Sequence, residues 1–198
     1  ASLKAANVVP PLGSDADYLA IASLLLDKKA DPKATSSKGS PLIIAARSAP
    51  ADMVALLVDR GGDIEDVWAT PGFTPLMAAA SGGRVPVIEL LLQKGAKLEA
   101  RTPQGATALH IAAQANQPEA IKALIKAGLD VDERDGSNAT PLIIAAATGQ
   151  LEAVITLLEQ GAKADAAANQ GITALKASRQ HNQQEVLQYL VDREANKR

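Results

Sequence analysis

Short blocks of apolar residues recur along the chain at a nearly constant distance from one another. The block Ser-Pro-Leu-Ile-Ile-Ala-Ala at 40–46 returns with small changes from Thr74, Thr107 and Thr140, and in a weaker form from Thr173. The starts are separated by 34, 33, 33 and 33 residues. Self-similarity at a period of about 20–50 residues is the signature of a repeat array. The pattern therefore predicts five to six stacked units.

A second apolar block follows the first in each unit and ends at a glycine. Leu56-Leu57 precedes Gly61, Leu91-Leu92 precedes Gly95, and the same phase holds for the later copies. A Ser or Thr before Pro favours a helix start, because the hydroxyl caps free N–H groups and Pro needs no N–H there. Glycine after a helix favours a left-handed stop. Each unit is therefore predicted to hold two short helices, followed by a polar, turn-rich segment.

The period, with Thr-Pro-Leu-x-x-Ala-Ala and a later Leu-Leu-x-x-Gly-Ala, resembles the ankyrin-repeat family. The copy at 107–113 is nearest to the family hallmark, with Ala108 in place of proline. The resemblance covers about residues 36–192. It implies an all-α ankyrin-repeat solenoid, in which helix–turn–helix units with protruding hairpin loops stack into a slightly curved array. It also implies a hydrogen-bonded structural role for His110. In size, the chain resembles small stand-alone bacterial ankyrin proteins.

The repeat phase predicts one ankyrin domain over residues 1–198, with modified units at both ends. Residues 16–29 are predicted to form the outer helix of an irregular first unit, with Leu3–Ala6 as its inner helix. The alternative for residues 1–14 is an arm that contacts a partner. The predicted bounds are 1–35 for the N-terminal capping repeat, 36–68, 69–101, 102–134 and 135–167 for the internal repeats, and 168–198 for the C-terminal capping repeat.

Composition and charge exclude several classes of function. The chain has 47% hydrophobic and 21% charged residues and a net charge of -2, which argues against disorder and against a nucleic-acid partner. No apolar run reaches the roughly 18 residues of a membrane span, so no membrane insertion is expected. The lack of cysteine excludes disulfides and zinc–thiolate sites. It also favours, with the start at Ala1, an exported periplasmic protein; the alternative is cytoplasmic. The capped ends favour a monomer.

The sequence offers no pattern for catalysis, cofactor binding or metal binding. The two histidines, His110 and His181, lack metal-ligand spacing, and neither a phosphate-binding loop nor a Gly-x-Ser-x-Gly elbow is present. Carboxylates cluster at 63–66 and 130–135 without the order of a calcium loop, and we interpret them as solvated turns. We therefore predict that the protein is not an enzyme and needs no cofactor.

Trp68 and Phe73 are the strongest candidates for partner contact. They are the only Trp and the only Phe, and they lie in the loop that carries the array's extra residue. Large aromatic rings are enriched among interface hot spots. The alternative is that Trp68 covers the base of its own loop. Further candidates lie at predicted ends of first helices or at loop tips, where solvated positions without a partner would vary equally: Arg47, Ser81, Arg101, Gln104, Gln114, Arg134 and Ser137.

These features favour a protein-binding module over an enzyme. Loop tips and one helical face form a continuous surface in a solenoid, and the arginines among the candidates would suit an acidic partner surface, because guanidinium pairs with carboxylate in a bidentate manner. The expected partner is another protein, such as an enzyme that the chain inhibits or protects against. The alternative is a passive scaffold or assembly factor.

Overall fold

The computed structural model describes residues 15–195, and its contacts divide between two compact units at Asp31 and Pro32. In the first unit, helix α1 runs over Asp15–Asp27, where the sequence predicts a helix at 16–29. The proposed helix Leu3–Ala6 and the alternative arm at 1–14 lie outside the described residues. The single domain over 1–198 and its internal bounds stay predictions.

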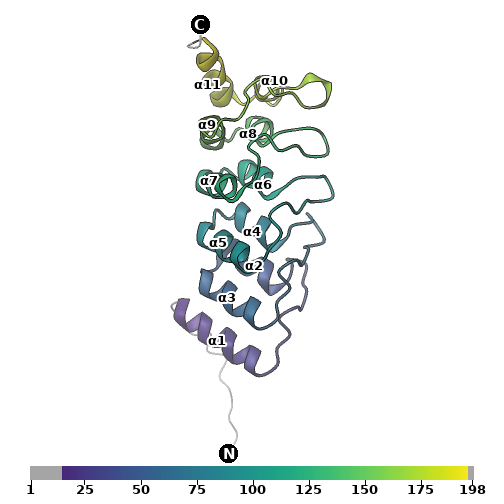
Figure 1. The fold of residues 1–198 in the computed structure, drawn as a ribbon, viewed down its shortest axis with the longest axis vertical. Coiled ribbons are helices and arrows are strands. Elements are labelled where there is room, and N and C mark those ends of the chain that lie inside the picture. The colour runs from purple at the N-terminus through teal and green to yellow at the C-terminus, as the bar shows by residue number, and fades with distance from the viewer. Residues whose placement is uncertain (1–14, 196–198) are drawn as a thin grey trace, which may run out of the picture. The chain divides into compact units, whose positions relative to one another are not determined.

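The second unit is built from five consecutive helix pairs. The inner helices α2, α4, α6, α8 and α10 pack on one another in sequence order, and the outer helices form a second column beside them (Figure 1). The described residues contain helices, a short 3-10 turn η1 and two isolated β-bridges, which confirms the all-α prediction. The pairs are α2 (Pro41–Ser48) and α3 (Ala51–Asp59), α4 (Pro75–Ser81) and α5 (Val85–Gln93), α6 (Ala108–Gln114) and α7 (Pro118–Ala127), α8 (Pro141–Thr148) and α9 (Leu151–Glu159), and, after η1 (Asn169–Gly171), α10 (Ala174–Gln180) and α11 (Gln184–Ala195).

The inner helices start where the hydroxyl residues predict. The side-chain oxygens of Ser40, Thr74, Thr140 and Thr173 each accept a hydrogen bond from the backbone N–H three residues later, at 3.3–3.4 Å. This contact satisfies one of the free N–H groups of the first turn, and it fixes the start of each helix at the same place in the repeat. The start of each of these inner helices is therefore set by residues of its own repeat.

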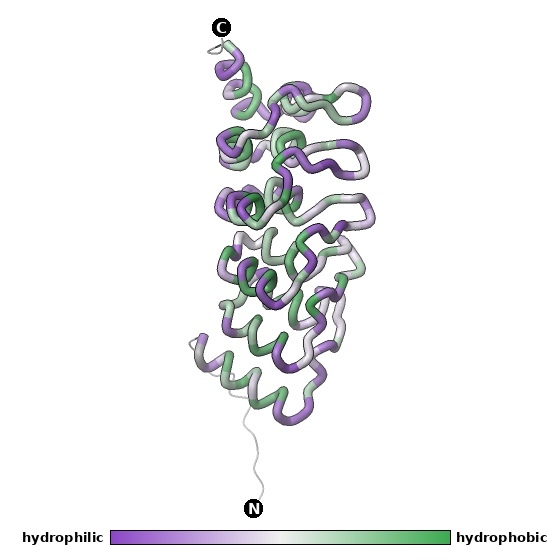
Figure 2. Tube along the Cα trace, in the orientation of Figure 1, coloured by the Kyte–Doolittle hydropathy of each residue, from purple (hydrophilic) through white to green (hydrophobic). Residues whose placement is uncertain are grey.

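Small side chains let the inner helices lie close together. The paired alanines of each block are buried, as are the leucines two residues after each cap in α2, α4, α6 and α8. Figure 2 shows apolar residues along the helices and polar ones along the connecting loops. Two repeats approach closely at Gly82, where an added Cβ would lie only 2.0 Å from the carbonyl oxygen of Arg47. The stack is thus held by aliphatic packing between repeats, with backbone nearly touching backbone at this point.

A hairpin-like loop precedes each inner helix from α4 onward and projects to one side of the helix columns (Figure 1). One backbone hydrogen bond closes each loop. Trp68 N–H donates to the carbonyl of Phe73 at 2.9 Å, and the equivalent donors in later loops are Thr102, Asp135 and Ala168. None of the helices within residues 15–195 has the length and hydropathy needed to cross a bilayer.

Candidate partner-binding groove

Corresponding positions of successive inner helices form a strip beside the loops. Arg47, Ser81 and Gln114 each lie seven residues after the cap of their helix, so the predicted residues on these helices occupy one repeat position. The position three residues earlier is held by Ile44, Ala78, Ile111 and Ile144. Residues three apart on a helix share a face, and both rows therefore point to the same side of the stack.

A first hollow of about 670 Å³ lies over α2, α4 and the loop between Trp68 and Phe73. It brings together four of the predicted contact residues, from two repeats and the loop that joins them. Aliphatic and aromatic side chains supply most of its walls. Its lining residues are Lys38, Ile43, Ile44, Arg47, Ser48, Trp68, Pro71, Phe73, Ala78 and Ser81.

A second hollow of about 260 Å³ continues from the first over α6 and α8. Pro71 and Phe73 line both hollows, so the surface is continuous across the aromatic loop. We call the two hollows together the groove. The second adds the predicted residues Gln104 and Gln114, and its full lining is Pro71, Phe73, Thr102, Gln104, Ala106, His110, Ile111, Gln114, Asp135 and Ile144.

Trp68 braces its loop against the preceding one. The indole Nε1 donates to the carbonyl of Ser37 at 3.1 Å, and the ring lies beside Gly39, where an added Cβ would be 3.4 Å from Trp68 Cγ. The ring therefore packs against the neighbouring loop and not against the base of its own loop. It also lines the first hollow. Its polar atom has a partner within the protein, and its apolar surface is left half exposed.

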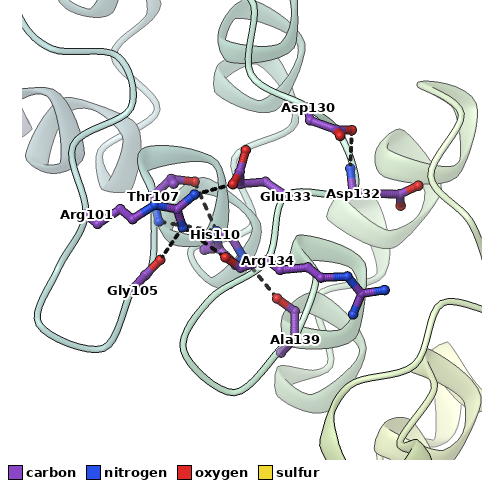
Figure 3. A network of polar contacts seen from close by, with 9 residues as sticks. All are labelled: Arg101, Gly105, Thr107, His110, Asp130, Asp132, Glu133, Arg134 and Ala139. Atoms are coloured by element: carbon purple, nitrogen blue, oxygen red, sulfur yellow. Dashed lines mark hydrogen bonds and ion pairs between the residues drawn. The ribbon is translucent and has the colours of Figure 1, made fainter.

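Arg101 and Arg134 join consecutive loops, and Figure 3 shows the contacts of Arg101. The Arg101 guanidinium donates to the carbonyls of Gly105 at 2.8 Å and Arg134 at 2.9 Å, and pairs with Glu133. Arg134 repeats the arrangement one unit on, with the carbonyls of Asn138 and Ala167 at 2.8 Å. Sequence reasoning missed this bridging role, although the 33-residue spacing of the two arginines was its signal.

The loop tips are joined through their backbones as well. The carbonyl of Gln104 accepts from Gly136 N–H at 2.9 Å, and that of Ser137 accepts from Asn169 N–H at 3.2 Å. Arg101, Arg134 and Ser137 do not line either hollow of the groove. Partner contact by Arg101, Arg134 and Ser137 stays a prediction, whereas the structure gives each of them a partner in the adjacent repeat.

Hydrogen bonds add a structural role to the clustered carboxylates that we interpret as solvated turns; examples are Glu65, Asp132 and Asp135. Glu65 accepts from Lys97 N–H at 2.8 Å and Asp132 from Lys163 N–H at 3.0 Å, so each joins its repeat to the next. Asp135 accepts from Ser137 and Ala139 N–H within its own loop. Within the described part of the chain, no three His, Cys, Asp or Glu side chains gather as a metal site would need.

His110 is buried between two repeats. Its Nδ1 accepts from the Thr107 backbone N–H at 3.3 Å and lies 3.0 Å from the Thr107 hydroxyl, so the Nε2 proton points to the Ala139 carbonyl, 3.1 Å away (Figure 3). The ring thus completes a capping box with Thr107 at the start of α6 and also binds the next loop through the Ala139 carbonyl. Burial lowers the pKa of His110 below its usual 6.5, despite the raising effect of the Ala139 hydrogen bond.

Stability is therefore expected to fall as the pH drops from 7.5 to 5.5. Because the pKa of His110 is lower in the folded chain, the unfolded chain binds the proton first, from about pH 6.5 downward. The free energy of unfolding is then fully retained above that pH and is lost as the pH falls towards the folded-state pKa. Urea unfolding of wild type and His110→Gln at both pH values measures the effect. The variant should lose less stability on acidification than wild type; equal losses in the two chains would refute the assignment.

The comparisons with known proteins agree with this architecture. The family model for ankyrin repeats (three copies) matches residues 65–135 and 127–198. The chain belongs to the ankyrin-repeat family. Ankyrin repeats generally bind other proteins and are typically non-enzymatic.

Curated relatives match over only part of this chain and a small part of their own length. Human Ankyrin repeat and KH domain-containing protein 1 is 42% identical over 65 residues, 33% of this chain and 2% of the human protein. Alpha-latrocrustotoxin-Lt1a of Latrodectus tredecimguttatus is 35% identical over 83 residues, 42% of this chain and 6% of the toxin. Ankyrin repeat protein nuc-2 of Neurospora crassa is 37% identical over 79 residues, 39% of this chain and 7% of that protein. The chain spans only a small part of the length of each of these relatives.

Proposed function

We propose that the chain binds a partner protein in the groove over α2, α4, α6 and α8. The observation that carries the proposal is the continuity of the two hollows across Pro71 and Phe73, which brings six of the nine predicted contact residues onto one surface. An apolar hollow with a few polar groups at its edges is typical of a binding site. Ordinary solubility does not require such a surface.

Hydrogen bonds to residues outside the groove fix the segments that line it. The Trp68 indole is fixed by Ser37, and the loops that carry Gln104 and Asp135 are joined by the Gly136 backbone bond. A surface that is already ordered pays less conformational entropy when it binds, and more of the contact energy then appears as affinity. This supports a role as an inhibitor or protective partner of an enzyme, because a rigid concave surface can cover the mouth of an active site.

A passive scaffold uses the same groove without affecting its partner. The two roles differ in one measurement: saturating amounts of the purified chain should lower the activity of a partner enzyme if the chain inhibits, and leave that activity unchanged if it is a scaffold. The periplasmic placement of this pair stays a prediction from the sequence.

The binding surface itself is tested by hydrogen exchange. The immobilised chain captures its partner from the native source, and amide exchange is then compared between the free chain and the purified complex. Protection is expected in α2, in residues 66–81 and in residues 104–114, because these segments line the groove. The outer helices α3, α5 and α7 serve as internal controls and should exchange as in the free chain. Protection confined to those outer helices would refute the proposal.

A further inference from the structure

The charged residues of the groove are distributed unevenly. Lys38 and Arg47 line the first hollow, and no carboxylate lines it. The second hollow is lined by the carboxylate of Asp135 and by the amides of Gln104 and Gln114, with no Lys or Arg. The groove therefore has a cationic end over α2 and a polar to anionic end over α6 and α8.

The two cations of the first hollow are available to a ligand. In the described residues, no hydrogen bond or ion pair holds the side chain of either Lys38 or Arg47, and both residues are exposed. Other arginines of the array are used internally: Arg84 donates to the Ala49 carbonyl at 3.0 Å, and Arg101 bridges two loops. Of the three arginines predicted to contact an acidic partner, Arg47 alone keeps a guanidinium without such a bond.

Apolar surface lies directly beside these cations. Ile44 is 42% exposed and stands one helical turn before Arg47, so both project into the same hollow. The half-exposed rings of Trp68 and Phe73 line the same hollow. The three residues from Ile44 to Arg47 rise about 4.5 Å, which lies between the lengths of one and two residues of extended chain, and side chains two residues apart on an extended chain share a face. An extended peptide could therefore meet the cation and the apolar wall with side chains about two residues apart.

We propose that the first hollow takes an extended segment of the partner protein that places a carboxylate against Arg47 and Lys38 and a large apolar side chain against Ile44, Trp68 and Phe73. This rests on the proposed function and adds the chemistry of the partner. Guanidinium and carboxylate form the strong, charge-assisted pairs of protein interfaces. A single-stranded nucleic acid is the competing occupant. Its regularly spaced phosphates would extend into the second hollow, which is lined by Asp135 and by no Lys or Arg that could pair with them.

The test is a selection from a random peptide library displayed on phage, with the whole chain as bait. Peptides that also bind Trp68→Ala are removed, so that those retained depend on the groove. Enrichment of Asp or Glu within a few positions of Leu, Ile, Phe or Trp is expected. A synthetic peptide of the enriched sequence should bind Arg47→Glu roughly tenfold or more weakly than wild type, because a charge-assisted pair is lost and a repulsion is gained.

Arg179→Glu provides the matched control. Arg179 also lies in the last turn of an inner helix, α10, and is exposed, but it lines neither hollow. The substitution therefore has the same effect on the helix dipole, and peptide affinity should stay at the wild-type value. A selection repeated on Arg47→Glu should turn the preference from acidic to basic peptides.

Enriched peptides without acidic residues, or equal affinity of wild type and Arg47→Glu, would overturn the inference. So would a library that yields no groove-dependent peptide, or an oligodeoxythymidine strand that binds the groove in its place. In each case the exchange footprint of the partner complex separates the two proposals: a footprint in the groove leaves the proposed function standing and removes only the acidic segment.

Discussion

Gly82→Ala is expected to lower the free energy of unfolding by about 1–3 kcal/mol, the usual effect of forcing extra atoms into a packed interior. The added methyl group would lie 2.0 Å from the carbonyl oxygen of Arg47, a backbone atom of the preceding repeat. It cannot be accommodated by a side-chain rotation. The end of α4 must therefore move away from the end of α2, which loosens the contact between two neighbouring inner helices.

The direction of this change in the free energy of unfolding distinguishes close packing from a backbone preference. Gly82 has φ -86° and ψ -3°, a conformation that alanine adopts without strain. At such a position alanine ordinarily stabilises a protein by about 0.4–1 kcal/mol, because it restricts the unfolded chain. Destabilisation by Gly82→Ala would thus report the close approach of the two repeats and not a backbone preference.

Ala115→Gly is the matched control, because Ala115 occupies the same repeat position after α6 with φ -88° and ψ 5°. This change should cost about 0.4–1 kcal/mol, so the preferred residue reverses between two equivalent positions. Urea unfolding followed by circular dichroism measures both variants. A Gly82→Ala chain as stable as wild type would contradict the packing described between α2 and α4.

The repeat architecture could be predicted from the sequence because each unit fixes its own helices by local chemistry. The hydroxyl residue at each cap and the glycine after each of α3, α5, α7 and α9 act within one unit. They recur in phase with the buried alanine pairs, which pack between units. Periodic apolar positions also carry most of the stabilising contacts in such an array. The positions of Arg47, Ser81 and Gln114 in the groove follow from the same periodicity.

The polar contacts between repeats could not be predicted in the same way. Arg101 and Arg134 have the character of ordinary exposed residues, and a long guanidinium side chain has many rotamers and small energy differences between partners. Only the structure places a carbonyl of the next loop within reach of each. Lys38 and Ile44 were missed as groove residues because neither is unusual in sequence; the row of fourth residues after each cap would have indicated Ile44.

The second large effect is expected in binding: Trp68→Ala combined with Phe73→Ala should weaken the complex with the partner protein about a hundredfold or more. Truncation of a hot-spot residue costs about 2 kcal/mol or more, and two such rings suffice for this loss even when their effects are not additive. Both rings line the first hollow, and Phe73 lines the second as well. Their truncation therefore removes apolar surface from the middle of the groove.

Val67→Ala is the control from the same loop. Val67 is 55% exposed and precedes Trp68 directly, but it does not line the groove. Its truncation removes apolar surface of the loop while the two hollows keep their walls. Unfolding midpoints of both variants show whether the stack is intact, which matters because Trp68 also holds the Ser37 carbonyl.

Calorimetric titration of the purified partner into wild type, Val67→Ala and the Trp68→Ala/Phe73→Ala chain measures how far binding depends on the groove. We expect near-equal affinities for wild type and Val67→Ala, and an affinity about two orders of magnitude lower for the folded double variant. Equal affinity of all three chains would contradict the claim that this groove is the surface that binds the partner.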